Sequence, residues 1–321
     1  MAVMAPKIFP LAGKRVWVAG HRGMVGSAIV RRLAKENCTI LTADRADADL
    51  VRQDDVERWV ANARPQVVIV AAAKVGGILA NSEYPADFLY ENLMIEANII
   101  KAAHDCAVEK LLFLGSSCIY PRNASQPIAE DALLSGPLEA TNEWYAIAKI
   151  AGIKLCQAYR RQHGADFIAA MPTNLYGPGD NFHRDNSHVI PALIGKLDEA
   201  VRGGARTVEI WGSGTPRREF MHVDDLADAC IFLLAAYSDF DHINIGSSVD
   251  IPIAELARLI GSVTSYSGDF YFDISKPDGT PRKLMDSGKL RALGWSPSID
   301  LRIGLADAYA WYQTNRNTAR H

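Results

Sequence analysis

The chain has 321 residues, which is too long for one simple core and fits two lobes that share a cleft. Hydrophobic residues make up 49% of it and charged residues 22%, an ordinary globular composition that excludes a mainly disordered chain. The net charge is −3, so the sequence lacks the basic excess that nucleic acid or an acidic membrane surface selects.

The first half of the chain alternates predicted strands with predicted helices. Strands are expected at 15–19, 39–43, 67–73, 111–114 and 167–171, and helices at 27–36, 54–63, 87–106 and 142–163. The run VVIVAAA at 67–73 is continuously apolar, as in a strand that is buried on both faces. Repeated βα units of this kind predict an α/β fold with a Rossmann-type, doubly wound parallel sheet.

The second half is less regular and predicts a smaller C-terminal α/β domain. Strands are expected at 208–211 and 243–245, helices at 223–237, 253–263, 286–293 and 301–313, and loops at PTNLYGPG (172–179) and 181–188. The strand at 243–245 is expected to rejoin the main sheet. We therefore predict a Rossmann domain of 12–178 plus about 214–248, and a substrate domain of about 179–213 plus 249–321.

A glycine-rich turn follows the first predicted strand and opens the first helix. Gly20, Gly23 and Gly26 have the spacing GxxGxxG. The first glycine permits a tight turn, the second lets the backbone approach a pyrophosphate, and the third lets the helix pack close to the strand. The amides at the helix N-terminus then face the anion. The motif alone is weak, but its place in the first βαβ unit predicts a dinucleotide site.

The end of the second strand bears on which dinucleotide binds. An acidic residue there favours the free ribose hydroxyl of NAD, whereas arginines favour the 2′-phosphate of NADP. Asp44 and Arg45 stand side by side at this point, and Arg22 lies in the glycine turn. The two arginines favour NADP(H), and NAD(H) stays open.

A tyrosine and a lysine stand four residues apart in the predicted helix at 142–163. Tyr145 and Lys149 therefore share one face, and Ser116 follows the strand at 111–114, at the edge where parallel sheets bind ligands. The tyrosine hydroxyl can protonate a carbonyl that is being reduced, and a nearby ammonium is expected to lower its pKa. The serine can hold the same carbonyl. With the glycine turn, this set resembles the extended form of the short-chain dehydrogenase/reductase family.

A larger set of stretches is similar to one branch of that family, the GDP-L-fucose synthases, and covers nearly the whole chain. The stretches are GHRGMVGSAI (20–29), AAAKVGGILAN (71–81), YPADFLYEN (84–92), LLFLGSSCIYP (111–121), EWYAIAKIAGIKLC (143–156), MPTNLYGPGDNF (171–182), NSHVIPALI (186–194), WGSGTPRREFMHVDDLA (211–227) and KPDGTPRKLMD (276–286). Members of this branch convert GDP-4-keto-6-deoxy-D-mannose to GDP-L-fucose with NADPH. The resemblance implies the same reaction for this chain.

The resemblance implies two activities in one site. Carbons three and five of the keto-sugar are epimerised through an enolate, and hydride then reduces the carbonyl at carbon four. The epimerisation pair carries over to Cys118 and His188, because a thiol can be tuned to accept a proton near neutral pH and a histidine can deliver one to the opposite face. The reductase residues carry over to Ser116, Tyr145 and Lys149.

The resemblance also implies the residues that contact cofactor and substrate, and no metal. The cofactor set is Gly20, His21, Arg22, Gly23, Met24, Val25, Gly26, Arg45, Leu114, Gly115, Ser116, Ser117, Lys149, Pro172, Thr173, Asn174, Leu175 and His188. The substrate set is Lys196, Trp211, Arg218 and Asp278. Arg218 can bind a phosphate through two parallel hydrogen bonds.

Two departures from the branch concern charge. Lys196 stands where the branch has an arginine, so the positive charge survives and the planar guanidinium is lost. At the end of the second strand, the branch has two arginines, and here Ala43 stands at one position and Arg45 at the other. The second departure weakens the NADP(H) prediction and leaves the fold prediction intact.

Other functions stay open at this point. Another nucleotide-sugar 4-keto reductase, 4-epimerase or 4,6-dehydratase would use the same scaffold, although a simple reductase would not require Cys118 and His188. A dehydratase usually has an acidic residue near the carbonyl-binding serine, where this chain has Ser117. A non-enzymatic dinucleotide-sensing protein is a more distant alternative, and such proteins commonly lose the reactive tyrosine or lysine.

The cysteines and the apolar runs bear on compartment and partners. Five scattered cysteines without a CxxC pair argue against disulfides or a zinc site and fit a reducing cytosol. No apolar run reaches the roughly 18 residues of a membrane span, and the first 14 residues lack a signal peptide's apolar stretch. We predict a cytoplasmic enzyme with no membrane or nucleic-acid partner. The resemblance suggests a homodimer through the helices at 87–106 and 142–163.

Overall fold

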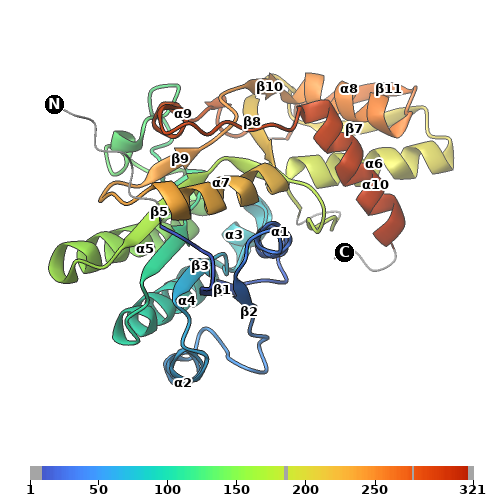
Figure 1. The fold of residues 1–321 in the computed structure, drawn as a ribbon. Helices are drawn as coiled ribbons and strands as arrows, with labels where there is room; N and C mark the ends of the chain where they lie inside the picture. Colours follow the sequence, from blue (N-terminus) through green and yellow to red (C-terminus); the bar gives the residue numbers. More distant parts are fainter. Residues whose placement is uncertain (1–8, 184–186, 277, 317–321) are drawn as a thin grey trace.

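The computed structural model describes residues 9–183, 187–276 and 278–316. At its centre is a six-stranded sheet of order β2-β1-β3-β4-β5-β9, in which every pairing is parallel (Figure 1). The strands are β1 (Arg15–Ala19), β2 (Thr39–Leu41), β3 (Val67–Val70), β4 (Lys110–Leu114), β5 (Phe167–Pro172) and β9 (Ile243–Ile245). The strand at 243–245 thus rejoins the main sheet, as the sequence predicts.

Helices cover both faces of this sheet. The helices α1 (Met24–Leu33) and α7 (Val223–Ala236) lie on one face, and α2 (Gln53–Ala63), α4 (Pro85–Asp105) and α5 (Glu143–His163) lie on the other (Figure 1). Alternate side chains of β1 serve the two layers, because Val16 and Val18 pack with α1 and α7 whereas Trp17 packs with α2 and α4. The doubly wound α/β fold is confirmed.

The chain reverses direction across the sheet between β1 and β3. After β2 the chain crosses back over β1 to form β3, so neighbouring connections leave a crevice beyond the carboxyl ends of β1 and β3. The backbones converge at this point, where a Cβ on Gly20 would lie 2.7 Å from the Cα of Ala72. Ligands of open α/β sheets bind in such a crevice.

The C-terminal elements form a second, separate core. The helices α6 (Val189–Gly203), α8 (Ile253–Thr264) and α10 (Leu301–Asn315) pack on β7 (Thr207–Trp211) and β11 (Asp269–Asp273), coloured yellow to red in Figure 1. A small sheet joins the two cores. In it, β8 (Arg217–His222) pairs with β6 (Asn174–Tyr176), β10 (Asp250–Pro252) and β12 (Arg282–Lys283). On the basis of these two cores, we propose the same division into two domains that the sequence predicts.

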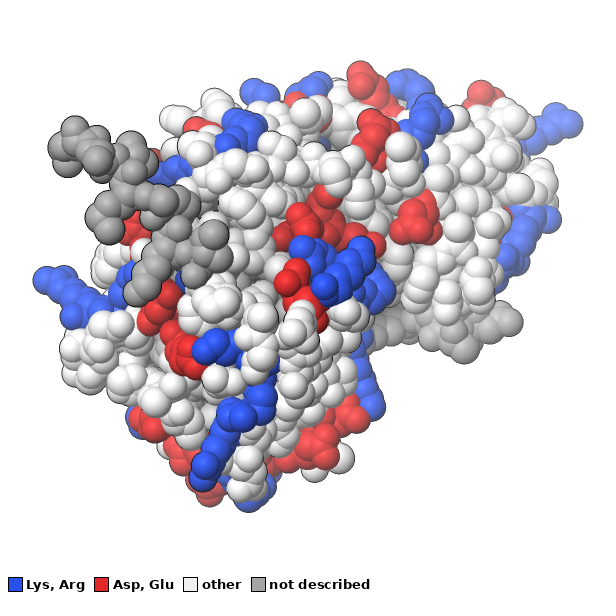
Figure 2. Space-filling model, in the orientation of Figure 1, with Lys and Arg blue, Asp and Glu red and all other residues white. Residues whose placement is uncertain are grey.

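Short elements complete the described chain. They are α3 (Ile78–Glu83), α9 (Gly288–Ala292), and the 3-10 turns η1 (Ser117–Ile119), η2 (Glu130–Ala132) and η3 (Ala140–Asn142). None of the described helices is long and apolar enough to cross a membrane. On the face in Figure 2, acidic and basic side chains are interspersed, in keeping with the small net charge.

Two sequence predictions are wrong in detail. PTNLYGPG is not all loop, because residues 174–176 form β6 against β8, a partner 46 residues away in the register. Three residues carry no periodic signal, and a distant partner decides their pairing. The first helix begins at Met24 and not at residue 27, because Gly23 already occupies the N-cap. In the predicted loop at 181–188, residues 184–186 lie outside the described residues.

Candidate active site

The glycine turn joins β1 to α1 and is built as a cradle. Gly20 has a φ of +87°, and its carbonyl accepts a hydrogen bond from the Gly23 amide at 3.0 Å. A Cβ on Gly26 would lie 2.1 Å from the Gly20 carbonyl oxygen, so α1 rests directly on the turn. A Cβ on Gly23 would have one neighbour, that same oxygen at 3.4 Å. The side of the turn at Gly23 therefore has room for a ligand.

The start of α1 suits an anion. Its N-cap residue, Gly23, provides no side-chain hydrogen bond, and the first turn contains no acidic residue. The first amides of a helix lack partners within the helix and carry partial positive charge. Met24 and Val25 stand at this end, partly buried against the sheet. These features fit the pyrophosphate of a dinucleotide.

The residues that bear on NADP or NAD lie on both sides of the crevice. Arg22 forms an ion pair with Asp44, and His21 Nε2 lies 3.3 Å from the same carboxylate. Arg45 is 83% exposed and pairs with Asp49 at 3.4 Å. Arg22 and Arg45 are therefore paired with different carboxylates, Asp44 and Asp49.

The segment after β4 carries the serine and the thiol. Leu114 ends β4, and the Gly115 amide still bonds to the sheet through the Ala170 carbonyl at 2.9 Å. Ser116 caps η1, with its hydroxyl accepting from the Cys118 amide at 3.5 Å. Ser117 is buried, and Cys118 is 7% exposed. The strand end thus places Ser116 and Cys118 side by side at the carboxyl edge.

Tyr145 and Lys149 lie in successive turns at the start of α5. The Lys149 Nζ is 5.9 Å from the centre of the Tyr145 ring and 4.7 Å from the centre of the Phe113 ring. It also lies 3.7 Å from Glu96 Oε2, and both of these side chains are 3% exposed. The helical spacing read from the sequence is confirmed, and the lysine is buried between α4, α5 and β4.

The protonation states differ from two expectations. Burial raises the pKa of Tyr145 well above its usual value, and nearby Cys118 and Glu96 raise it further. The expected lowering by Lys149 is not found among these influences, and burial lowers the pKa of Lys149 itself, against the opposing charge of Glu96. Burial also raises the pKa of Cys118, against the opposing charges of Lys283 and Lys149. The expected tuning of the thiol toward neutral pH is therefore not found.

His188 occupies the N-cap position of α6 and stays neutral near pH 7. The residue is exposed by its surface area, although neighbouring protein atoms still remove part of the water around its ring. Partial burial lowers its pKa, and the positive charge of Lys283 lowers it further. The charge of Lys283 also opposes the raised pKa of Cys118, and Cys118 and Lys283 line one pocket.

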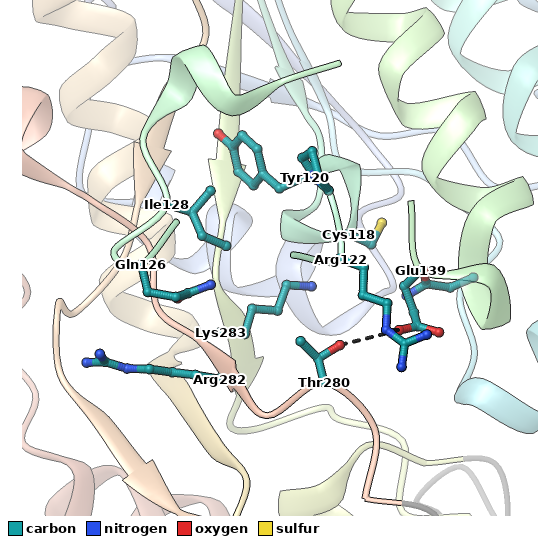
Figure 3. Close-up of a pocket in the computed structure, with 11 residues that line it drawn as sticks. Cys118, Tyr120, Arg122, Gln126, Ile128, Glu139, Thr280, Arg282 and Lys283 are labelled. Carbon is teal, nitrogen blue, oxygen red and sulfur yellow. Dashed lines mark hydrogen bonds and ion pairs between the residues drawn. The ribbon is translucent and has the colours of Figure 1, made fainter. Parts of the chain in front are cut away.

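Sequence reasoning missed Lys283. It extends from β12 into a pocket that Cys118 also lines, with Glu139 on the far side (Figure 3). The other residues that line this pocket are Tyr120, Pro121, Arg122, Gln126, Ile128, Asn142, Thr280 and Arg282. Lys283 is the third basic residue of the matching stretch KPDGTPRKLMD, after Lys276 and Arg282. The basic residues of this stretch, close to the predicted substrate residue Asp278, were the sequence signal that could have indicated Lys283.

The segment after β5 is fixed to two neighbouring strands. Pro172 ends β5, and the Thr173 amide donates to the Ile245 carbonyl at 2.9 Å. The Asn174 side chain donates to the Glu219 carbonyl at 2.8 Å, and Leu175 is partly buried. The stretch 172–175 thus lies at the same carboxyl edge as Ser116.

The predicted substrate residues Lys196 and Trp211 are neighbours in the second core. Trp211 is 56% exposed at the end of β7, and its ring lies 5.3 Å from the Nζ of both Lys196 and Lys276. Its indole nitrogen donates to Glu209 at 3.0 Å. An exposed aromatic ring between two cations suits a flat, anionic ligand.

Arg218 and Asp278 lie across the loop that follows β7. Partial burial lowers the pKa of Arg218, and Asp278 opposes this shift. Arg218 donates to the Arg217 carbonyl at 2.8 Å and is not held by the neighbouring Glu219, which is fully buried. Asp278 accepts from the Ser213 amide at 2.7 Å and from its hydroxyl at 2.8 Å. Asp278 therefore anchors this loop beside the guanidinium.

Comparison with known proteins gives a family that agrees with the residues of this site. Residues 16–246 match the model of the NAD dependent epimerase/dehydratase family. A GDP-L-fucose synthase from Sinorhizobium fredii is 59% identical over 96% of this chain and 98% of its own length. This chain belongs to the GDP-L-fucose synthase branch of that family. The resemblance drawn from the sequence is confirmed, and so is the expectation of an enzyme.

Other relatives match this chain along nearly its whole length. The GDP-L-fucose synthase of Escherichia coli is 53% identical over 97% of this chain and 100% of its own. A GDP-L-fucose synthetase from Naegleria fowleri bound to NADP is 27% identical and superposes with a TM-score of 0.90, covering 98% of this chain and 99% of its own. The similarity thus spans both cores.

Proposed function

We propose that this family member epimerises carbons three and five of GDP-4-keto-6-deoxy-D-mannose and reduces its 4-keto group with NADPH to give GDP-L-fucose. One observation carries the proposal: the segment after β4 that holds Ser116 and Cys118 packs against α5, whose first two turns hold Tyr145 and Lys149. We propose that this thiol, the phenol of Tyr145 and the imidazole of His188 face one sugar ring. The high identity to GDP-L-fucose synthases supports the same substrate.

The cofactor we propose is NADP(H), held at the carboxyl edge of the sheet. The first amides of α1 would hold its pyrophosphate, Arg22 its 2′-phosphate, and residues 172–175 would lie beside its nicotinamide. Bound NADPH supplies the hydride that carbon four accepts. Arg22 has to share its charge between Asp44 and the phosphate, so we expect NADPH to be preferred less strongly than two converging arginines would allow.

Epimerisation requires a base on one face of the ring and an acid on the other. At neutral pH the ligand-free site holds Cys118 as a thiol and His188 as a neutral imidazole. For Cys118 to act as base, its proton leaves as His188 gains one. The thiolate then takes the proton from carbon three or five, the enolate oxygen is held by Ser116 and Tyr145, and the imidazolium returns a proton to the opposite face. Lys283 favours the thiolate.

Reduction uses the residues on the other side of the carbonyl. As carbon four gains hydride, its oxygen gains negative charge, and Tyr145 donates its phenolic proton to that oxygen. A raised phenol pKa keeps this proton in place until it is needed. Ser116 holds the carbonyl oxygen, and the ammonium of Lys149 stabilises the phenolate that forms, 5.9 Å from its nitrogen to the ring centre.

The GDP portion would extend toward the second core. We propose that Trp211 stacks on the base, with Lys196 and Lys276 beside it, and that Arg218 and Lys283 bind the pyrophosphate. Asp278 would hold the loop at 212–214 that shapes this part of the cleft.

The test is to incubate the enzyme with the GDP-keto-sugar in heavy water, with and without NADPH or NADH. We expect deuterium at carbons three and five without cofactor, and GDP-L-fucose when NADPH is added. Reduction without exchange would point to a simple 4-keto reductase. The absence of both exchange and reduction would contradict the proposal.

Two glycine substitutions separate folding from cofactor binding. Gly26→Ala is expected to destabilise the fold by about 3 kcal/mol or more, because its Cβ would meet backbone that cannot move aside. Gly23→Ala has one ordinary neighbour for its Cβ and should leave the free energy of unfolding nearly unchanged. It should nevertheless weaken NADPH binding about tenfold, because the methyl occupies the place of the pyrophosphate. Urea unfolding and fluorescence titration measure the two effects.

We propose that the enzyme is a cytoplasmic homodimer. All five cysteines are free, as in a reducing compartment. Tyr90 in α4 and Trp144 and Ile147 in α5 are exposed apolar side chains on two helices that pack together. Such a patch suits a second copy of the same helix pair, which would form a four-helix interface.

A further inference from the structure

A buried carboxylate lies behind the proposed catalytic lysine and has no part in the steps above. Glu96 is in α4, and its Oε2 lies 3.7 Å from Lys149 Nζ. Within the described part of the chain, Lys149 and the Gly152 amide are the polar groups that stabilise this carboxylate, and neither makes a close hydrogen bond to it. Buried carboxylates are rare unless they are paired, so a partner must account for this one.

The neighbouring helix is shaped around this carboxylate. Gly152 stands in the middle of α5, where glycine is unfavourable for a helix. A Cβ there would lie 2.4 Å from the Phe113 ring and 2.9 Å from Glu96 Oε2. Glycine at this position therefore lets the ring and the carboxylate approach the helix directly below Lys149.

Few ionisable groups surround the lysine. Glu96 comes from α4, Cys118 from η1 and Tyr145 from the same helix as the lysine. The charge of Glu96 also raises the pKa of Cys156, one turn after Gly152. Burial lowers the pKa of Lys149, and Glu96 is the largest influence that raises it. Burial raises the pKa of Glu96 to about 7, and Lys149 is the largest influence that lowers it. Each group thus favours the charged form of the other.

We infer that Glu96 is a positioning residue that keeps Lys149 a fixed, charged ammonium beside Tyr145 during ketone reduction. The inference rests on the proposed reductase step. Without the carboxylate, a lysine this deeply buried would lose its proton at lower pH. Its neutral amine would no longer stabilise the phenolate of Tyr145.

The test is Glu96→Gln, which keeps the shape and removes the charge. We expect the alkaline limb of the pH profile of kcat for reduction to move about one unit toward neutral. The rate at pH about 9 should therefore fall about tenfold, whereas the rate near pH 7 falls about twofold and KM for the sugar stays within about twofold. Glu91→Gln is the matched control, since it makes the same change on the same helix at a surface pair with Lys74.

A second measurement needs no cofactor. Because the pKa of Glu96 is raised in the folded chain, that chain binds more protons than the unfolded one between pH about 4.5 and 7, and stability falls as pH rises through this window. Glu96→Gln lacks this contribution. The urea midpoint of the variant should therefore rise relative to the unsubstituted enzyme from pH about 5 to 8.

The outcomes are distinguishable. If the unsubstituted enzyme is active and the pH profile of Glu96→Gln coincides with its profile, the inference is overturned. A fall in kcat that is equal at every pH would also overturn it, because such a fall indicates a packing role alone. Absence of reduction in the unsubstituted enzyme would instead count against the proposed function, and the urea comparison would still test the pair. If Glu96→Gln does not fold, Glu96→Asp replaces it in the test. Aspartate keeps the negative charge but holds it farther from Lys149, so a smaller shift of the same limb is expected.

Discussion

Tyr145→Phe is expected to lower the rate of ketone reduction by about 10²- to 10⁴-fold, because the variant has no proton to give to the oxygen at carbon four. The ring itself should stay in place, since it packs edge-on against Phe88 with the ring centres 6.5 Å apart and Phe keeps that contact. NADPH consumption with the GDP-keto-sugar measures the loss. Exchange at carbons three and five should fall much less, because Cys118 and His188 are intact.

Tyr159→Phe is the matched control for this variant. Tyr159 lies in the same helix but packs against His104 and Phe167, away from the site. Its substitution should leave reduction within about twofold. A Tyr145→Phe enzyme that reduces the ketone at the normal rate would show that another group, or water, donates the proton.

Cys118→Ser is expected to suppress proton exchange at carbons three and five by about 10²- to 10⁴-fold. A serine hydroxyl holds its proton far more tightly than a thiol, and Lys283 cannot compensate for that difference. The ketone can still accept hydride, since Ser116, Tyr145 and Lys149 remain. The expected product is the GDP-6-deoxyhexose with unchanged configuration at both carbons, identified by NMR after reaction in heavy water.

Cys230→Ser serves as the control for the loss of a buried thiol. Cys230 is fully buried in α7, in the layer on the other face of the sheet. Any loss of exchange in that variant would reflect stability and not chemistry. Unchanged exchange in Cys118→Ser would remove Cys118 from the mechanism and leave His188 to be tested as the base.

The sequence alone was sufficient for the regular core and the motif residues. The strands at 15–19, 67–70 and 111–114 and the helices around Tyr145 were predictable because apolar periodicity within a short window reports burial directly. The glycine turn was predictable because three glycines at that spacing have few other uses at a strand–helix junction. The branch was recognisable from stretches that span both cores.

The tertiary structure decided what depends on distant partners. The strand β6 exists because β8 lies beside it, and Lys283 reaches the site because β12 pairs with that same strand. Charge states also follow from packing. Burial raises the pKa of Tyr145, where the nearby lysine suggested a lowered value, and it raises the pKa of Cys118 as well.

Glu96 shows the difference between what the sequence predicts and what the packing of the helices decides. Its place on the buried face of α4, four residues after buried Asn92 and four before buried Ile100, could be read from helical spacing as a misplaced charge. That it faces Lys149 could not, because the angle at which α4 packs on α5 is set by the side chains of both helices and by Phe113 beneath them. A single chain segment encodes burial, whereas the partner of a buried charge is decided when the helices pack.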